Sequence, residues 1–499
     1  MAPKATKHQP LRIVQLNPCC SSWMGLRLLL LLVFLVVVAS ASSNTSKIVT
    51  TLPGYTGELP FTLETGYIGV GDNETVQVFY YFVESQRSPS RDPLMLWMSG
   101  GPGCSGLAGI FFESGPVTFK LGDYNGSLPT LQDNPFAWTQ SLNIIYMDGP
   151  VGTGFSYSES LDGYITGDYK FVAQTYEFLQ KWLNEHPQFL ENQLYVGGES
   201  YSGLLIPILV QQILLGNEAG IVPMINLSGY VLQNPATDSF IDTNARIPYA
   251  HRLSLISDQL YESAKSSCNS IYVDIDASNY QCSSDVDAID ELTSSINSLH
   301  ILEPYCTNGI PEPNEDVESV RRSLSEKSSH AHWCRSYNHM LCYVWANNEG
   351  VQEALGVRPG TKTFWQYCNT SLAYTKEVTS VVGYHQNLTN ADLRALIYSG
   401  DHDMSVPHIG TQKWINSLNL STDESWRVWS LNGQTAGWVS KFANLLTIPP
   451  TPLFFYLLIR SLNHVLSHTN LQGAGHIAAE YKVNECAAMI DRWMAYFPI

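Results

Sequence analysis

The segment YVGGESYSGLLIP, Tyr195–Pro207, places a serine between small residues where a strand-like run meets a helix-like run. A nucleophilic serine on such a sharp turn requires small residues two positions before and after it, because strand and helix nearly touch there. Gly198 and Ser202 occupy those positions around Ser200, although the G-x-S-x-G pattern has glycine in place of Ser202. The segment therefore fits a nucleophile elbow, and also a glycine- and serine-rich turn without chemistry.

A nucleophilic serine needs a base and a carboxylate that orients the base. Downstream of Ser200, the apolar run LIYSG leads into a loop with Asp401 and Asp403, and a glycine-flanked loop further on carries His476. The order serine, acid, base is that of the α/β hydrolases. Asp401 remains an alternative to Asp403. Two histidines near the acidic loop remain alternatives for the base: His402 and His408.

An oxyanion intermediate needs backbone N–H donors beside the serine. The run PLMLWM ends in the glycine cluster SGGPGCSG, residues 99–106, where one donor is expected, and the N–H of Tyr201 would be the other. Alone, this cluster is also an ordinary glycine- and proline-rich loop. The sequence contains no H-E-x-x-H motif and no G-x-x-x-x-G-K loop, and its cysteines suit disulfides better than metal, so we expect no metal and no cofactor.

Strand-like and helix-like segments alternate in two blocks of the chain. The continuous apolar runs at 93–100 and 142–150 end in glycine or proline, which is typical of strands buried on both faces of a parallel sheet. Residues 168–187 have apolar positions at helical spacing and stop at proline. The alternation returns from residue 393 and ends in the helix-like run ECAAMIDRWMAYF. It predicts a doubly wound α/β fold.

Residues 239–386 interrupt this alternation. They are rich in serine and cysteine and contain short helix-like pieces such as SDQLYESAKSSC. We interpret them as an insertion that covers one end of the sheet and is held by disulfides. The hydrolase-like core would then comprise residues 43–238 and 387–499.

The amino terminus predicts entry into the secretory pathway. A basic leader precedes the apolar run Leu28–Ala39 and the small residues ASASS. That run is shorter than the roughly 20 apolar residues that a bilayer requires, and the pattern is typical of a signal peptide over residues 1–42. After cleavage near Ala41 or Ser42 no stable membrane span would remain. An uncleaved anchor is the alternative.

Composition agrees with an extracellular or vacuolar protein. The formal net charge of −18 disfavours nucleic acid as a partner, since phosphate binding needs a basic surface. Eight cysteines would remain after cleavage, an even number suited to an oxidising compartment. Seven N-x-S/T sequons are candidate glycosylation sites: Asn44, Asn73, Asn125, Asn226, Asn369, Asn387 and Asn419.

Together these stretches resemble the serine carboxypeptidases, and more closely the plant serine carboxypeptidase-like branch. The matching stretches include LMLWMSGGPGCSGLAGIFFESGP, NIIYMDGPVGTGFSYS, YVGGESYSG, GYVLQNPATD, LIYSGDHDMSVPHIGTQKWI and GAGHIAAEY. The resemblance implies an α/β-hydrolase fold with a mixed, mostly parallel central sheet and a disulfide-pinned insertion, or lid, domain. It also implies the following roles: Ser200 as nucleophile, His476 as base, Asp403 rather than Asp401 as the orienting acid, and Gly101 and Tyr201 as oxyanion donors.

The resemblance leaves the substrate open between a peptide and a small acyl compound. In the family's peptidases two glutamates and an asparagine hold the substrate's terminal carboxylate. Glu113 and Glu199 match the glutamates, but Ser99, beside Gly100, stands at the asparagine position. Two adjacent carboxyl groups would share a proton, which favours activity at acid pH. Serine at that position resembles the plant acyltransferases that use glucose esters, although those usually carry Asp in place of Glu199.

Three functions therefore remain possible from the sequence. The first is hydrolysis of C-terminal peptide bonds at acid pH, through an acyl-serine intermediate. The second is transfer of an acyl group from a 1-O-glucose ester to an alcohol. The third is a catalytically impaired secreted binding protein.

Two further expectations concern the cysteines and an unusual segment. The resemblance implies the disulfides Cys104–Cys334, between the oxyanion loop and the insertion, and Cys268–Cys282. Residues 445–468, LLTIPPTPLFFYLLIRSLNHVLSH, form an apolar insert that departs from the family and fits neither strand nor helix. Because the insert precedes His476, it could displace the base from its productive position.

Overall fold

The computed structural model describes residues 46–121, 126–305, 319, 335–362, 364–443 and 464–499. The predicted signal peptide, 1–42, and the sequons Asn44 and Asn125 lie outside the described residues. In the part of the chain that is described, no helix is both long enough and apolar enough to cross a membrane.

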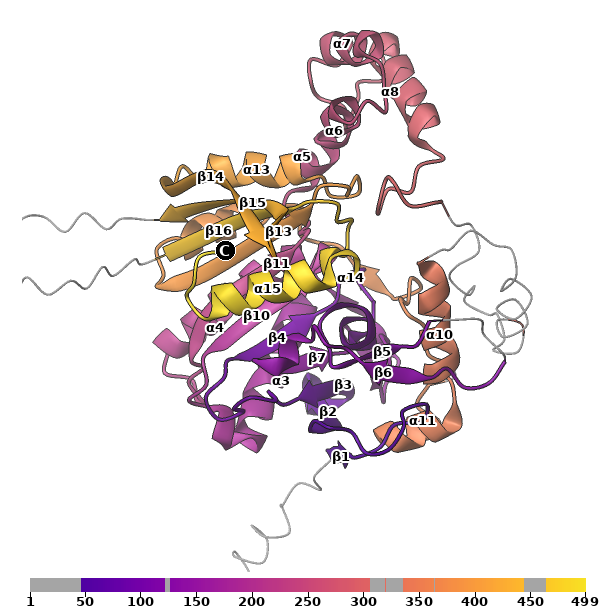
Figure 1. Ribbon diagram of the computed structural model, residues 1–499, viewed down its shortest axis with the longest axis vertical. Helices are drawn as coiled ribbons and strands as arrows, with labels where there is room; N and C mark the ends of the chain where they lie inside the picture. The colour runs from indigo at the N-terminus through magenta and orange to yellow at the C-terminus, as the bar shows by residue number, and fades with distance from the viewer. Residues whose placement is uncertain (1–45, 122–125, 306–318, 320–334, 363, 444–463) are drawn as a thin grey trace, which may run out of the picture. The chain divides into compact units, whose positions relative to one another are not determined.

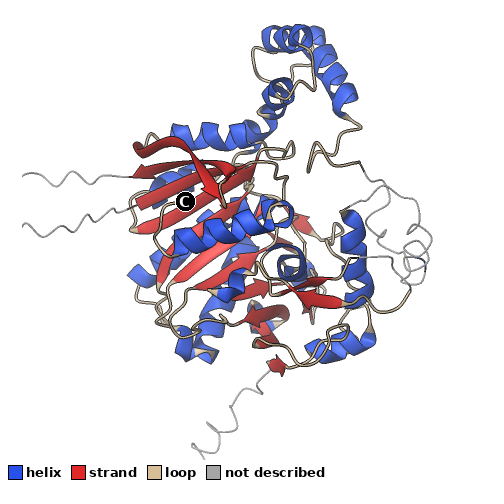
Figure 2. Ribbon diagram, viewed as in Figure 1, coloured by secondary structure: helices blue, strands red, loops and turns tan. Residues whose placement is uncertain are grey.

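A 12-stranded mixed sheet forms the centre of the fold (Figures 1 and 2). Its middle strands are parallel, in the order β7 (Asn143–Met147), β4 (Leu94–Met98), β10 (Leu194–Glu199), β11 (Leu227–Gln233), β13 (Leu393–Gly400) and β16 (His464–Leu471). Antiparallel strands extend both edges: β1 (Lys47–Val49), β2 (Leu63–Val70) and β3 (Val76–Val83) beyond β7, and β15 (Gln434–Ala443) and β14 (Ser421–Leu431) beyond β16. The predicted α/β-hydrolase sheet is confirmed.

The central strands are apolar throughout because both faces of the sheet are covered. In β4, Met95 and Trp97 point into one core cluster and Leu94 and Leu96 into the other, as the two-residue period of a strand requires. One face packs against α3 (Asp168–Glu185), α4 (Ile206–Glu218), α12 (Val382–Leu388) and α13 (His408–Ser417). The other packs against α10 (Ser336–Ala346), α11 (Glu349–Leu355), α14 (Ala478–Tyr481) and α15 (Val483–Met494).

The region expected to be an insertion, 239–386, has two structural roles. Its helices α7 (Asp258–Ser267) and α8 (Tyr280–Thr293) pack on each other around a small apolar cluster of their own, and the predicted Cys268–Cys282 disulfide joins their ends. By contrast, α10 and α11 are part of the main core, with Trp345 fully buried against the sheet. The expectation that this whole region covers one end of the sheet is therefore too simple, because its apolar helices also fill one face.

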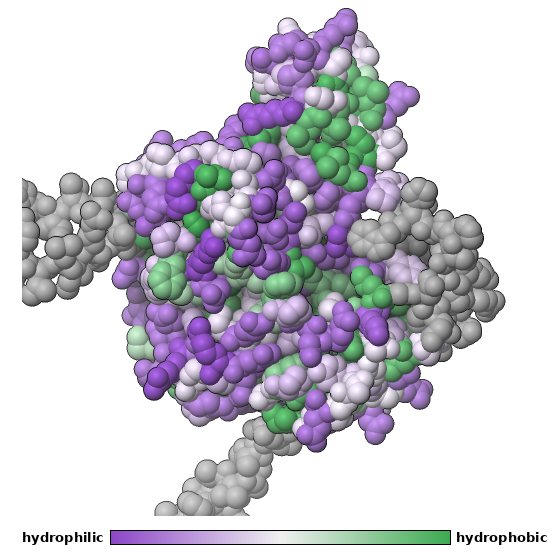
Figure 3. Space-filling view, in the orientation of Figure 1, coloured by the Kyte–Doolittle hydropathy of each residue, from purple (hydrophilic) through white to green (hydrophobic). Residues whose placement is uncertain are grey.

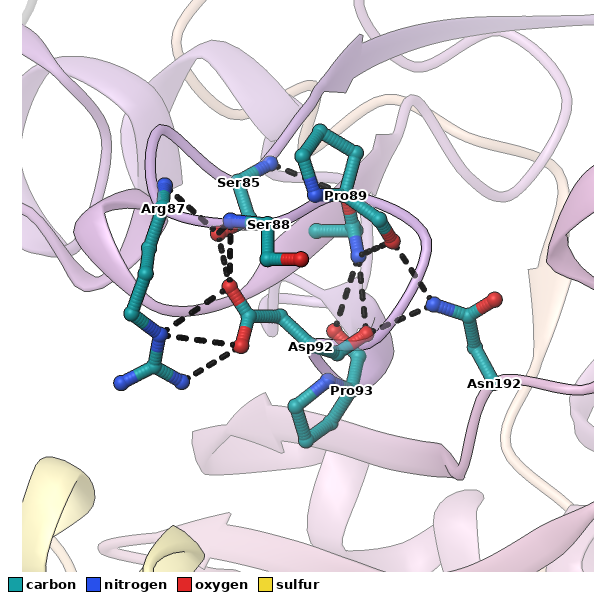
Figure 4. A network of polar contacts seen from close by, with 8 residues as sticks. Ser85, Arg87, Ser88, Pro89, Asp92, Pro93 and Asn192 are labelled. Atoms are coloured by element: carbon teal, nitrogen blue, oxygen red, sulfur yellow. Dashed lines mark hydrogen bonds and ion pairs between the residues drawn. The ribbon is translucent and has the colours of Figure 1, made fainter.

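The amino ends of β7, β4 and β10 are fastened by a polar network (Figure 4). The Nδ2 of Asn192 donates to the carbonyls of Pro89 and Asp92, at 2.8 and 2.7 Å, and the Nδ2 of Asn143 donates to the same two carbonyls. The carboxylate of Asp92 accepts bonds from the guanidinium of Arg87. This network fixes the starts of three strands, so that their carboxyl ends are positioned to carry functional loops.

The unusual segment 445–468 enters the sheet at its end. Residues 464–468 begin β16, which pairs parallel with β13 and antiparallel with β15, so the expectation that they fit no strand is wrong. The remainder, 445–463, lies outside the described residues. Ala443 pairs with Val465 at the amino edge of the parallel strands, and the eight residues of β16, at roughly 3.3 Å per residue, lead from there towards His476. At its described end, therefore, the segment joins the sheet at the edge opposite to the one from which the chain runs on to His476.

Candidate active site

Ser200 lies in the sharp turn between β10 and α4, where φ is 57°. Backbone strain of this kind costs about 1–3 kcal/mol and persists only where the surroundings hold it. A Cβ at Gly198 would lie 2.3 Å from the Met98 carbonyl oxygen and 2.5 Å from the Ser202 Oγ. The Ser202 hydroxyl in turn donates to the Glu199 carbonyl at 2.7 Å. The close approach of strand and turn explains why only small residues flank Ser200.

An unbroken line of hydrogen bonds connects the ends of three strands. The Oγ of Ser200, after β10, lies 2.8 Å from the Nε2 of His476, after β16. The Nδ1 of the same imidazole lies 2.8 Å from the Oδ2 of Asp403, after β13. If Nδ1 carries the proton and donates to the carboxylate, Nε2 is free to accept the serine proton.

The Asp403 carboxylate is fully buried and well satisfied. Its Oδ2 also accepts a bond from the Nδ2 of Asn234 at 2.8 Å, and its Oδ1 accepts the N–H groups of Ser405 and Val406. The neighbouring Asp401 instead accepts the N–H of Gly473 at 2.6 Å. Sequence analysis missed Asn234, although it directly follows an apolar strand, as Asp401 does.

The electrostatics separate His476 from the other candidate bases. Burial alone would lower the pKa of His476, but the Asp403 carboxylate outweighs it and raises the pKa above its ordinary value. Burial lowers the pKa of His408 to about 4, and this ring packs against Tyr249. His402 packs against His300, with ring centroids 5.0 Å apart. Of the three histidines, His476 is the one that the structure hydrogen-bonds to both Ser200 and an aspartate.

Two buried glutamates lie beside the nucleophile. The Oε1 of Glu199 accepts the N–H of Gly100 at 2.6 Å, and the Oε2 of Glu113 accepts from the Nε2 of Gln233 at 3.3 Å. Burial raises the pKa of Glu199, and burial together with the Glu199 charge raises the pKa of Glu113 well above its usual range. Two carboxyl groups so placed hold a proton at pH values where isolated ones would be ionised.

Ser99 also lies at this site, but its hydroxyl faces the protein. The Oγ donates to the Ser105 carbonyl at 3.3 Å, and the residue is buried. While that bond is kept, the Ser99 hydroxyl proton is not available to a ligand. Its conformation distinguishes this site from one with an asparagine amide at the same position.

The glycine cluster lies directly against the nucleophile. A Cβ at Gly100 would lie 2.8 Å from the Cβ of Ser200 and equally close to the Glu199 carbonyl oxygen. Gly101 adopts φ 109°, a conformation that favours glycine. The buried Asp148, which sequence analysis missed, holds the loop by accepting from the Ser105 hydroxyl at 2.6 Å and the Gly106 N–H at 2.8 Å.

The expected Cys104–Cys334 disulfide is wrong, because Cys104 is bonded to Cys368. The two cysteines face each other in an antiparallel bridge, with Cα atoms 3.9 Å apart. On either side of them, the Ser105 N–H donates to the Tyr367 carbonyl and the Asn369 N–H to the Gly103 carbonyl. Cys334 lies outside the described residues. Sequence spacing could not choose between the two partners, since the pairing depends on which segment crosses the glycine loop.

Two other described cysteines, Cys342 and Cys486, are buried free thiols. Within the described ranges, no group of three or more His, Cys, Asp or Glu side chains is placed to hold a metal ion.

The chain is similar to a sequence family, to plant proteins and to a solved structure. The sequence model described as serine carboxypeptidase matches residues 53–496. Serine carboxypeptidase-like 8 of Arabidopsis thaliana is 43% identical over 457 residues, covering 91% of this chain and 96% of that protein. Serine carboxypeptidase-like 10 of the same plant is 44% identical over 459 residues, with the same coverage. The fold is similar to that of Kex1(delta)p, a prohormone-processing carboxypeptidase from Saccharomyces cerevisiae, with a TM-score of 0.66, 17% identity and coverage of 87% and 92% of the two chains.

Proposed function

The chain belongs to the serine carboxypeptidase family, and we propose that it works through an acyl-serine intermediate formed on Ser200. The observation that carries the proposal is the pair of 2.8 Å hydrogen bonds that link Ser200, His476 and Asp403. His476 would take the hydroxyl proton as Ser200 attacks the substrate carbonyl, and Asp403 would stabilise the imidazolium. The N–H groups of Gly101 and Tyr201 would bind the oxyanion. His476 would then return the proton to the leaving group.

The favoured reaction is removal of C-terminal residues from peptides, with binding of the substrate favoured on the acid side by the glutamate pair. The buried pair Glu113 and Glu199 supports it, because a shared proton lets two carboxyl groups bind a substrate carboxylate by hydrogen bonds. Water would complete the reaction by attacking the acyl-serine. We also propose that the enzyme acts outside the cell or in the vacuole, in keeping with the leader and the sequons.

A second candidate is acyl transfer from a glucose ester. The specific observation in its favour is Ser99, which turns its hydroxyl back to Ser105 where the family's peptidases present an amide to the substrate. Ser200 would displace glucose from the ester, with the proton from His476 passing to the sugar oxygen. An alcohol would then accept the acyl group in place of water. A catalytically impaired binding protein fits less well, because the hydrogen-bonded Ser200, His476 and Asp403 would then serve no purpose.

The test is labelling with a serine-directed fluorophosphonate, followed by a choice of substrates. We expect the purified protein to be labelled and Ser200→Ala to lose the label completely. Ser202→Ala is the matched control, since it removes a hydroxyl from the same turn, and it should keep the label. Absence of label on the folded wild type would contradict both enzymatic functions. A blocked dipeptide and a glucose ester with an alcohol then separate peptidase from transferase by the product formed.

A further inference from the structure

Asp168, at the amino end of α3, is a fully buried carboxylate that accepts four hydrogen bonds. Its Oδ1 accepts from the phenol oxygens of Tyr201 and Tyr374, at 2.8 and 2.7 Å. Its Oδ2 accepts from the N–H groups of Glu377 and Val378, at 2.6 and 2.8 Å. Nothing in the proposed chemistry uses this carboxylate directly, so its cost of burial calls for another explanation.

One of these four donors belongs to the residue that follows the nucleophile. The side chain of Tyr201 is buried, and its ring meets the edge of the Tyr374 ring. Burial, and then the bond to Asp168, raise the pKa of the Tyr201 phenol, which keeps it protonated as a donor. The backbone at Tyr201 is thus tied to α3 by its own side chain, immediately after the strained Ser200.

The Asp168 carboxylate is also linked to the glycine loop, which would supply the second oxyanion donor. The segment 368–378, which we term the oxyanion strap, begins at Cys368, which is bonded to Cys104 of the glycine loop. A Cβ at Gly103 would touch the side chain of Leu372 in the middle of this strap. The strap ends at the two N–H groups that bind Asp168. One continuous segment therefore contacts both loops that would supply oxyanion donors.

We propose that Asp168 is a positioning residue that sets the Tyr201 N–H relative to Ser200 and the glycine loop. The proposal rests on the proposed function, in which this N–H stabilises the oxyanion. Asp168 does not touch the reacting atoms. It acts by anchoring the Tyr201 side chain to the end of α3, while the N–H groups of Glu377 and Val378 hold its carboxylate in place.

Tyr201→Phe is the sharpest test, because it removes one phenol oxygen and leaves the backbone N–H in place. Its matched control is Tyr374→Phe, which removes a bond to the same Asp168 oxygen without changing Tyr201. Two probes avoid any assumption about the natural substrate: turnover of p-nitrophenyl acetate and the rate of fluorophosphonate labelling. Melting temperature is measured for each variant.

We expect Tyr201→Phe to lower kcat and the labelling rate by about 10-fold or more, since a displacement of about 1 Å can cost about 100-fold. KM for the acetate should stay within about 2-fold, because the oxyanion forms after binding. Tyr374→Phe should lower the melting temperature to a similar extent while kcat stays within about 2-fold. That split would support a positioning role.

Equal losses of kcat in both variants would overturn the proposal, because they would indicate a general effect of the cluster on folding. Unchanged kcat in Tyr201→Phe would overturn it too. If Tyr201→Phe does not fold, Asp168→Asn replaces it in the same comparison. A wild type that is not labelled would instead refute the proposed function itself, so the two failures are distinguishable.

Discussion

At the scale of single residues, the pH dependence of the site depends on two groups that work in opposite directions. His476 must be neutral to accept the Ser200 proton, and its pKa is raised by Asp403. Activity should therefore fall as the pH drops through that raised value. The glutamate pair must hold its shared proton to bind a carboxylate, so binding should weaken as the pH rises through the raised pKa of Glu113. A bell-shaped profile results.

Glu113→Gln should broaden this profile on its alkaline side. The amide keeps an oxygen for the Gln233 Nε2 but never acquires a charge, so the loss of binding at higher pH should be reduced. The measurement is kcat/KM against pH for a blocked dipeptide with a free terminal carboxylate. The same dipeptide with a terminal amide is the control, and its profile should not change. Equal shifts for both substrates would show that the glutamates do not contact the terminal carboxylate.

The three residues proposed to carry out the reaction were predictable from the sequence, whereas the residues that hold them in position were not. The sequence indicates the proposed catalytic residues by their order along the chain and by the loops after apolar strands in which they lie: Ser200, Asp403 and His476. Asn234, Asp148 and Asp168 are polar residues at the ends of strands or helices. Their hydrogen-bond partners lie far away in the sequence, as Asp403 does from Asn234. Such a contact cannot be predicted from the spacing of residues along the chain.

At the scale of elements, a second segment of the insertion holds the loops of the acid and the base together. The N–H of His476 donates to the Leu299 carbonyl at 2.7 Å, and the N–H of Met404 donates to the Ser298 carbonyl at 2.9 Å. Close by, Glu303 receives two bonds from the guanidinium of Arg335, which also donates to the Glu480 carbonyl. The catalytic loops are thus tied to each other through the insertion rather than only through the sheet.

Arg335→Leu should therefore reduce both stability and kcat. The lost charged hydrogen bonds are worth about 1.5–3 kcal/mol, and kcat should fall several-fold, roughly 3- to 10-fold, because the His476 loop loosens. Asn192→Ala is the control, since it breaks two hydrogen bonds at the amino edge of the sheet, remote from the site (Figure 4). It should lower the melting temperature and leave kcat unchanged. Comparable losses of kcat in both variants would contradict the link.

The strands and helices with strong patterns were predicted in place, from the buried strands β4 and β7 to α15. The two failures have a physical reason. The apolar helix α10 was assigned to a covering domain because cysteine and serine content marked the region as different, yet burial in the main core is what its apolar residues require. The start of β16 was hidden because its polar residues, such as His468, resemble neither an alternating nor a continuous strand pattern, although the strand is buried between two others.

At the scale of the whole molecule, the described sequons differ in whether a glycan can be accommodated. Asn73, Asn226, Asn387 and Asn419 are exposed. Asn369 is half-buried, its Nδ2 donates to the Gly152 carbonyl at 3.0 Å, and its Oδ1 accepts the Ser371 N–H. A glycan on that nitrogen would replace the bond to Gly152 beside the Cys104–Cys368 disulfide.

We expect glycans at the four exposed sites and none at Asn369. Enzymatic deglycosylation in oxygen-18-labelled water, followed by peptide mass spectrometry, would record occupancy site by site. Ser371→Ala removes the sequon at Asn369 and serves as the control. We expect it to leave the total mass of the attached glycans unchanged. Full occupancy of Asn369 in active protein would contradict the arrangement of this loop.

The register between β15 and β16 has a practical consequence. Ala443 and Val465 pair at the amino edge of the parallel strands, whereas Ser200 follows the carboxyl end of β10, so these two residues lie at the edge remote from the nucleophile. An affinity tag or a surface linker placed between these two residues would orient every immobilised molecule in the same way. The catalytic edge of the sheet would then face the solution, and a reactor packed with such a protein would keep its sites open to flow.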